Sequence, residues 1–225
     1  LILNLYAKWE AKWSWKFDTE KKKALRIMGP GPMDDYKTGK APWYKDAKTI
    51  NTIYIEDDVT HIGNYAFQYL KLVTSDITIP TSVKSIGCCA FSCLSSQVLN
   101  ISIATTAESQ LDSLDQNAFV SAKAHIDLSK SALLKKIGKD AFSKTQGDVT
   151  LPASIDTIAP NAFSNFKGSH VYIPVPDGKI LTLNGIGYSG EITNGKADIA
   201  SYLFPKYPKM KNSTAIKFKI VNPYD

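Results

Sequence analysis

The chain has 225 residues, of which 44% are hydrophobic and 21% charged, and it carries a formal net charge of +6. This composition is typical of a soluble protein with one or two domains, and no apolar run approaches the length of a membrane-spanning helix. The net positive charge comes from the two ends of the chain, since the central residues 50–174 carry nine lysines against eleven aspartates and glutamates. A nucleic-acid-binding protein presents a basic stripe on one face, so this class is not expected.

The segment 11–49 begins with a predicted β-hairpin. Apolar residues alternate with polar ones on both sides of a polar turn at residues 18–23; they are Trp13, Trp15, Phe17, Leu25 and Ile27. This pattern predicts two strands that share one apolar face. We expect the hairpin to pack on the repeats that follow it and to cap their open end. An aromatic platform for sugars, built from the tryptophans, is the alternative.

The segment 50–174 consists of tandem repeats, each of which contains an Ala-Phe pair. The phenylalanines of these pairs lie 24, 28, 23 and 21 residues apart; they are Phe67, Phe91, Phe119, Phe142 and Phe163. A period near 23 is the length of one coil of a solenoid, and such coils bury a common core only when they stack. We therefore expect about five coils and a sixth strand, with the Phe rings stacked as a spine.

A short strand is predicted about ten residues before each Ala-Phe pair. Six strand cores read apolar–polar–apolar: residues 53–55, 77–79, 101–103, 126–128, 149–151 and 171–173. Strands one coil apart run parallel, so we expect a single parallel sheet. In three copies a glycine (Gly63, Gly87 and Gly138) precedes the Ala-Phe pair and permits a left-handed or tight backbone. The Ala-Phe segment itself is predicted to form short helical turns.

Two regions depart from the repeat. The third coil, residues 98–123, is about four residues longer, and the extra residues at 105–109 are expected to form a loop. Residues 175–225 lack the repeat signature and are predicted to form a C-terminal cap or the start of another module. Within them, residues 181–183 and 216–220 have the character of strands. Residues 197–204, which end before Pro205, are predicted to form a short helix.

The pattern strand–Pro–x–x–Val–x–x–Ile-Gly–x–x–Ala-Phe resembles the BspA-like, Treponema-type leucine-rich repeat. Residues 77–91 and 149–163 follow it most closely, and the resemblance covers about residues 50–175. The segment from Trp15 to Tyr44 is similar to the stretch that often precedes such repeats in bacterial surface proteins. Leu5-Tyr-Ala-Lys-Trp9 resembles the closing strand of a Listeria–Bacteroides surface repeat. This second resemblance implies that residues 1–10 are the end of a preceding surface module or a linker.

The resemblance implies an α/β leucine-rich-repeat solenoid, dominated by β-structure, with a parallel sheet on its concave face. It also implies an extracellular or cell-surface location and a protein partner, because family members are associated with adhesion to host matrix proteins and to other bacteria. The resemblance implies no catalytic residues and no cofactor. The family often has a Cys three residues after the Phe, and here that position holds other residues, so no family role transfers to Cys93.

We expect the binding surface to be a ladder of polar side chains on the concave face. Alternation turns the polar residue of each strand outward, together with the residue two before it, and adjacent rungs lie about 5 Å apart. The candidate binding residues are Tyr54, Asp76, Asn100, His125, Asp127, Asp148, His170 and Tyr172. Tyrosine and charge together are typical of a protein-binding surface. The two histidines, expected beside carboxylates, predict binding that changes between about pH 5 and 7.

Catalytic and metal sites are not expected. A Cys–His nucleophile pair would need one of three cysteines (Cys88, Cys89 and Cys93) beside His61, and no hydrolase signature surrounds them. The Cys-Cys-x-x-x-Cys spacing is not a familiar zinc pattern. Three cysteines in one repeat are not a disulfide framework, so we expect mostly free thiols. The carboxylates of residues 56–58 could hold calcium, but a solvated turn is the favoured interpretation.

Three functions from different classes remain. The favoured one is a non-enzymatic, cell-surface or secreted module that binds other proteins, such as host extracellular-matrix or bacterial surface proteins. The second is a carbohydrate-binding module, which exposure of Trp13, Trp15 or Trp43 in a groove would favour. The third is a passive spacer in a large surface protein. Nucleic acid, membrane insertion of this fragment and cofactors are not expected.

Overall fold

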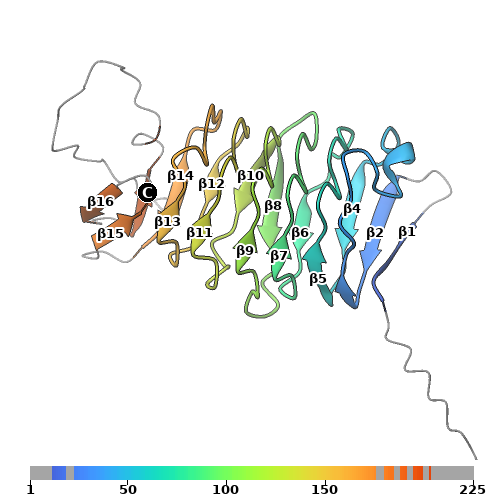
Figure 1. Ribbon diagram of the computed structural model, residues 1–225, viewed down its shortest axis with the longest axis horizontal. Coiled ribbons are helices and arrows are strands. Elements are labelled where there is room, and N and C mark those ends of the chain that lie inside the picture. The colour runs from blue at the N-terminus through green and yellow to red at the C-terminus, as the bar shows by residue number, and fades with distance from the viewer. Residues whose placement is uncertain are drawn as a thin grey trace, which may run out of the picture.

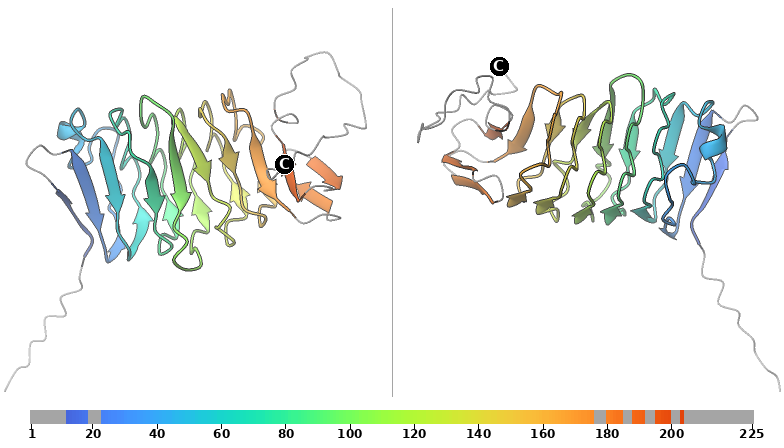
Figure 2. Two further views of the ribbon diagram at one scale, coloured as in Figure 1. Left: turned by 180° about the vertical axis from the view of Figure 1, so that it is seen from behind. Right: turned by 45° about the horizontal axis from the view of Figure 1, so that its top comes forward.

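The computed structural model describes residues 12–18, 23–175, 180–184, 188–191, 195–199 and 203. These residues form a β-solenoid whose coils stack side by side along the long axis of the molecule (Figure 1). Each coil contributes one strand to a main row of strands and, in most coils, a second short strand to a neighbouring row (Figure 2). The predicted repeats therefore form a solenoid.

The main row is a six-stranded sheet with the order β17-β14-β12-β10-β8-β6. Its parallel strands are β6 (Ile77–Ile79), β8 (Leu99–Ile103), β10 (Ala124–Asp127), β12 (Val149–Thr150) and β14 (Val171–Pro174). The last strand, β17 (Lys196–Asp198), runs antiparallel to β14. Apolar residues of each strand alternate inward, so Ile77, Ile101, Ile126, Val149 and Val171 form one buried row in register.

The first coil belongs to a separate sheet. Strand β4 (Thr52–Ile55) pairs in parallel with β2 (Ala24–Met28), and β2 pairs antiparallel with β1 (Ser14–Phe17). Our expectation of one sheet through all six strands was therefore wrong. Between the first and second coils, hydrogen bonds form just before the strands, where the N–H groups of Thr74 and Ser75 both donate to the Asn51 carbonyl.

The second apolar pair of each repeat forms another row of strands. β3 (Gly31–Pro32), β5 (Val59–Ile62), β7 (Ser85–Ile86) and β9 (Ser113–Leu114) make a four-stranded parallel sheet. β11 (Lys136–Ile137) pairs in parallel with β13 (Thr157–Ile158). Between β8 and β9, residues 104–112 have no regular structure, which agrees with the loop predicted at residues 105–109.

The Ala-Phe segments are β-turns rather than the short helices that we predicted. Alternate N–H groups close turns within the coil, as Ala66 does to Gly63 and Gln68 to Tyr65. The other N–H groups donate to carbonyls of the next coil: Tyr65 to Cys88, Phe67 to Ala90 and Tyr69 to Ser92. A helix would direct every N–H along its own axis, whereas stacked coils need half of them for their neighbours. The helical element with defined bounds is the short 3₁₀ helix η1 (Tyr44–Asp46).

The glycines of the motif allow neighbouring segments to approach closely, and their own backbone is not left-handed. Positive φ occurs two residues later, at Tyr65 (56°), Cys89 (55°) and Asp140 (54°), whereas Gly63, Gly87 and Gly138 are not left-handed. A φ near +60° at the third turn position is the mark of a type II turn. The left-handed part of our glycine interpretation was thus wrong, and the tight packing is found at two of the three positions.

The Phe rings form the predicted spine. Phe67, Phe91, Phe119 and Phe142 are fully buried, and consecutive ring centroids from Phe67 to Phe163 lie 5.0–5.5 Å apart. Trp43 continues the spine at its N-terminal end, with its ring centroid 6.1 Å from that of Phe67. The position of the Trp43 ring could not be inferred from the sequence, because it depends on the first coil, which the ring covers.

Beyond β14 the described residues are few. β15 (Ile180–Leu183), which includes the predicted strand 181–183, pairs antiparallel with β16 (Tyr188–Glu191). The start of the helix predicted at residues 197–204 lies in strand β17 instead. The strand predicted at residues 216–220 and the linker predicted at residues 1–10 lie outside the described residues.

Candidate functional site

The predicted ladder occupies the outward face of the main row of strands, and we keep that name for its eight residues. Seven of them lie on or next to the six-stranded sheet, and Tyr54 lies on β4 of the three-stranded sheet. The register aligns Asn100 with His125 on adjacent strands. Asp127 lies on the same strand as His125 and pairs with Thr150 of β12, which in turn pairs with Tyr172 of β14. The structure therefore brings these side chains into two adjacent rows.

In the first row, hydrogen bonds of the side chains join the second coil to the third, and the fourth coil to the fifth and sixth. The Asn100 side chain donates to Asp76 (2.9 Å), as does the Asn100 backbone N–H (2.8 Å), and these two bonds lower the pKa of Asp76. The backbone N–H of Asp148 donates to Nδ1 of His125 (2.9 Å). The carboxylate of Asp148 in turn accepts the backbone N–H of His170 (2.9 Å). Such a row is held in one arrangement, because each side chain is fixed by the coil beside it.

The row ends at a residue that sequence analysis missed. Asp198 of β17 lies 2.6 Å from Nδ1 of His170, and its other oxygen accepts the backbone N–H of Val171. Of the two ladder histidines, His170 therefore contacts a carboxylate, whereas Nδ1 of His125 accepts a backbone N–H. Asp198 was missed because we predicted a helix where β17 forms.

The second row contains Asp127 and Tyr172. One oxygen of Asp127 accepts the backbone N–H of Ser129 (2.9 Å), which leaves the carboxylate exposed on the surface. The ring of Tyr172 stacks on His170 with centroids 5.0 Å apart, and Nζ of Lys196 lies 3.9 Å above it. Burial, followed by the charges of Asp198 and Asp148, raises the pKa of the Tyr172 phenol. Tyr172 thus stays a neutral hydrogen-bonding group with an occupied face.

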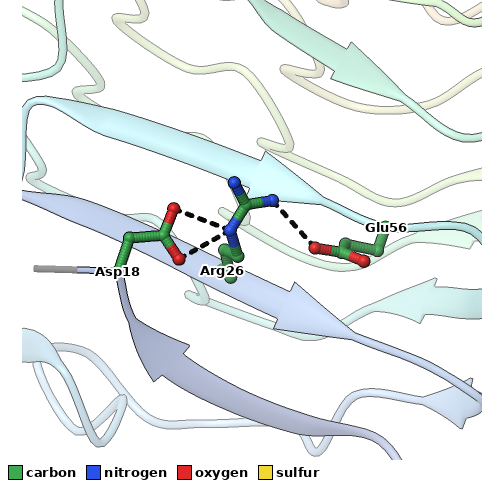
Figure 3. Close-up of polar contacts among 3 residues, drawn as sticks. All are labelled: Asp18, Arg26 and Glu56. Carbon is green, nitrogen blue, oxygen red and sulfur yellow. Dashed lines mark hydrogen bonds and ion pairs between the residues drawn. The ribbon is translucent and has the colours of Figure 1, made fainter.

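A matching arrangement lies at the N-terminal end of the ladder. Tyr54 is 43% exposed, and the guanidinium of Arg26 lies 4.2 Å from its ring centroid. Nε of Arg26 donates to both oxygens of Asp18 at 2.6 Å, and Nη1 donates to Glu56 at 2.9 Å (Figure 3). The bonds to Asp18 and then Glu56 raise the pKa of Arg26. Glu56, which we considered for calcium, is thus an ion-pair partner.

Arg26 was missed by sequence analysis, although a signal was present. Leu25-Arg-Ile27 reads apolar–polar–apolar, as the repeat strands do, and Arg26 is in register with Tyr54. A cation over an aromatic face is an attractive contact. Both ends of the ladder therefore carry a tyrosine under a cation, Arg26 at one end and Lys196 at the other.

His61 is the histidine outside the ladder, and in the described part of the chain its ring makes no contact with a cysteine. Nδ1 of His61 lies 2.7 Å from Oγ of Ser85, and Nε2 lies 3.2 Å from a carboxylate oxygen of Asp35. Burial raises the pKa of Asp35, but the Asn64 backbone N–H and His61 outweigh it, so the net pKa is lowered. Both ring nitrogens are engaged, and the three groups join the N-terminal segment to two coils. Among the described residues, none forms a cluster suited to a metal ion.

The cysteines are free thiols on one turn segment. Sγ of Cys88 and Sγ of Cys89 lie 3.5 Å apart, and all three cysteines are half-buried. Burial, followed by the neighbouring Cys88, raises the pKa of Cys89 to about 12. The thiolate is the form that reacts with alkylating agents. Cys89 is therefore expected to react slowly with alkylating agents.

Thiol labelling should count three free cysteines. In the denatured, unreduced protein we expect iodoacetamide to label three groups, and a count of one would show an internal disulfide. In the folded protein at pH 8, Cys89 should react about tenfold or more slowly than an exposed thiol, since its thiolate fraction is small. Mass spectrometry of peptides from timed labelling measures this rate, with labelling in denaturant as the control. Equal rates in both conditions would contradict the raised pKa of Cys89.

These features define the class of protein: a solenoid of stacked β-coils with an aromatic spine and a polar sheet face. The chain belongs to the BspA-type leucine-rich-repeat family, because the family model "BspA type Leucine rich repeat region" matches six copies over residues 40–175. Repeat modules of this type generally act as interaction scaffolds and not as enzymes. In the described part of the chain, no helix has the length and hydrophobicity needed to cross a bilayer.

Comparison with solved structures agrees on the fold. The chain is similar to a leucine-rich repeat protein from Eubacterium ventriosum ATCC 27560, with a TM-score of 0.59 and 22% sequence identity. The match covers 75% of this chain and 44% of the other, so the chain spans less than half the length of that protein. Comparison with curated proteins gives no significant match.

Proposed function

We propose that this protein is a non-enzymatic module, displayed at the cell surface or secreted, that binds another protein through the ladder. The observation that carries the proposal is the polar row from Asp76 to Asp198, in which hydrogen bonds between coils join Asp76 to Asn100 and join His125 onward to Asp198. A surface fixed in this way loses little side-chain entropy when a partner binds. The partners that we propose are host extracellular-matrix proteins or proteins on other bacterial surfaces.

Recognition without catalysis fits the chemistry of the ladder. Its carboxylates accept hydrogen bonds from backbone N–H groups, and its tyrosine rings lie under cations. Acyl or phosphoryl transfer would require a nucleophile, a base and donors for the developing charge around one reacting atom. Tyr and Arg side chains, by contrast, are the residues that most often dominate binding energy at protein interfaces. Tyr54, Tyr172 and Arg26 are therefore the expected anchors.

The test first identifies a binding partner and then measures how a double substitution in the ladder changes the affinity. The purified chain is passed over immobilised matrix proteins, and the dissociation constant of any retained protein is measured by calorimetry. Asp127→Ala combined with Tyr172→Ala should weaken binding at least about tenfold, the loss of about 1.4 kcal/mol that one interface anchor supplies. Neither side chain is buried, so the circular dichroism spectrum should stay unchanged.

A matched control separates this face from the rest of the surface. Tyr69→Ala combined with Asp112→Ala removes the same two side-chain types from exposed positions outside the ladder. This control should bind the partner like the unchanged protein. If the ladder variant binds normally while the control variant loses affinity, the binding surface lies on the turns or the second row of strands.

A further inference from the structure

The junction between the third and fourth coils differs from its neighbours in the row of short strands. This row is divided into two sheets, β3-β5-β7-β9 and β11-β13. Strands β9 and β11 follow one another along the solenoid (Figure 1), yet they do not pair. We call this gap, between residues 112–115 of the third coil and residues 135–138 of the fourth, the seam.

Two backbone hydrogen bonds that join neighbouring coils in this row are missing at the seam. At the other junctions, the residues just before and just after each short strand donate to the preceding coil at 2.8–3.0 Å. These bonds run from Lys84 to Thr60, Gly87 to Ile62, Asp112 to Lys84, Asp115 to Ile86, Asp156 to Lys135 and Ala159 to Ile137. The equivalent donors at the seam are the N–H groups of Lys135 and Gly138, and within residues 23–175 neither donates to a backbone carbonyl.

The exposure of Gly138 shows that the seam is open to solvent. Gly138 is partly exposed, whereas Gly63 and Gly87 at the same motif position are buried. Since glycine has no side chain, the exposed area is backbone. A Cβ added to Gly138 would lie 3.8 Å from its nearest neighbour, the Leu114 carbonyl oxygen, whereas one added to Gly87 would lie 2.5 Å from Oδ1 of Asn64. The preceding coil therefore lies farther from Gly138 than from Gly87.

The ladder is interrupted at the same junction. Side-chain hydrogen bonds join Asp76 to Asn100 on one side and join His125 onward to Asp198 on the other. Asn100 and His125 are in register on β8 and β10, but in the described chain no side-chain hydrogen bond links them. The third coil is also the one that carries the long loop at residues 104–112. The ladder thus consists of two internally bonded parts that meet at this junction.

The coils remain joined on their other two sides. Strands β8 and β10 pair over four residues in the main row. In the Ala-Phe turns, three backbone hydrogen bonds cross the junction, from Asn117 to Lys139, from Phe119 to Ala141 and from Ser121 to Ser143. The rings of Phe119 and Phe142 are stacked with centroids 5.5 Å apart. The two coils are therefore held along the main row and the turns, and are open only along the short strands.

We propose that the solenoid bends at the seam, with the first three coils and the following coils moving as two bodies. Hinges lie where few bonds must be broken for two packed units to move. When the seam closes, the N–H groups of Lys135 and Gly138 reach the carbonyls of Asp112 and Leu114. Because the main row stays bonded, this rotation changes the angle between the two parts of the ladder. If the ladder binds a protein as proposed above, the bend fits its curvature to that partner.

The test uses NMR spectroscopy of the full chain without a partner. In hydrogen exchange, the Gly138 amide should exchange at least about 100-fold faster than those of Gly87 and Ala159, which are hydrogen-bonded at the same motif position. Bending moves both sides of the seam on the microsecond-to-millisecond scale of hinge motions. We therefore expect ¹⁵N relaxation dispersion at residues 112–115 and 135–138, and flat profiles at Lys84 and Gly87.

A cross-link across the seam supplies the matched variant. Asp112→Cys combined with Lys135→Cys, oxidised to a disulfide, should flatten the dispersion on both sides of the seam. Lys84→Cys combined with Asp112→Cys bridges a junction that is already bonded, so its disulfide should leave the dispersion at residues 135–138 unchanged. Mass spectrometry of peptides confirms each pairing, because the chain has three cysteines of its own.

Two results would overturn the proposal. If the Gly138 amide is protected as well as that of Gly87, the seam is closed. If Gly138 exchanges rapidly but the dispersion profiles beside the seam are flat, the seam is open and does not bend. Both measurements are made without a partner, so they remain decisive even if the ladder binds no protein.

Discussion

Replacement of Phe142 by Ala should lower the free energy of unfolding by about 3–5 kcal/mol, the range for removal of a buried aromatic side chain. The Phe142 ring is fully buried between Phe119 and Phe163, with centroids at 5.5 and 5.0 Å. Its removal leaves a cavity that two rigid coils cannot close, because each coil is fixed by hydrogen bonds to the next. Denaturant unfolding followed by circular dichroism measures the loss.

The loss should also be local. In a repeat protein each coil contacts mainly its neighbours, so the array should loosen around the coils of Phe119, Phe142 and Phe163. Hydrogen exchange should rise at these coils before it rises at β2 and β4. Leu133→Ala is the control, since Leu133 is 50% exposed and surface changes usually stay within about 0.5 kcal/mol. An unfolding midpoint equal to that of the unchanged protein would refute the role of the spine.

Replacement of Gly87 by Ala should destabilise the second coil by about 1–3 kcal/mol, the typical cost of overpacking. A Cβ at this position would lie 2.5 Å from Oδ1 of Asn64 and 2.7 Å from the backbone nitrogen of Asn64. Both atoms are held in place, because Asn64 accepts the backbone N–H of Cys88 and donates its own to Asp35. The added methyl group therefore pushes two coils apart.

Gly138→Ala is the matched control for this change. Gly138 occupies the same motif position, and the nearest atom to an added Cβ is the carbonyl oxygen of Leu114 at 3.8 Å, an ordinary contact. Neither glycine has a left-handed backbone, so conformational strain is absent in both. Thermal unfolding of the two variants should therefore differ, with Gly138→Ala close to the unchanged protein. Equal losses would show that the approach of Asn64 does not matter.

The sequence was sufficient for the parts of the fold that depend on local pattern. The Ala-Phe period predicted the stacked coils, and the apolar–polar–apolar triplets predicted the main-row strands with the correct residues inward. Both predictions rest on the periodicity of apolar and polar side chains, which is visible in the sequence without knowledge of distant contacts. The ladder residues follow from the same alternation. Their place on one face could therefore be predicted, although their role in binding stays a prediction.

The contacts between coils were decided only by the tertiary structure. Whether the Ala-Phe segment forms a helix or a turn depends on N–H groups that bond to the next coil, some 23 residues away, as Phe67 does to Ala90. Likewise Arg26 over Tyr54, Lys196 over Tyr172 and Asp198 beside His170 are pairs from distant strands. The same holds for Gly87 and Gly138, which share a motif position but face different neighbours. A repeat determines what each coil presents, and only the register of stacking determines what each group meets.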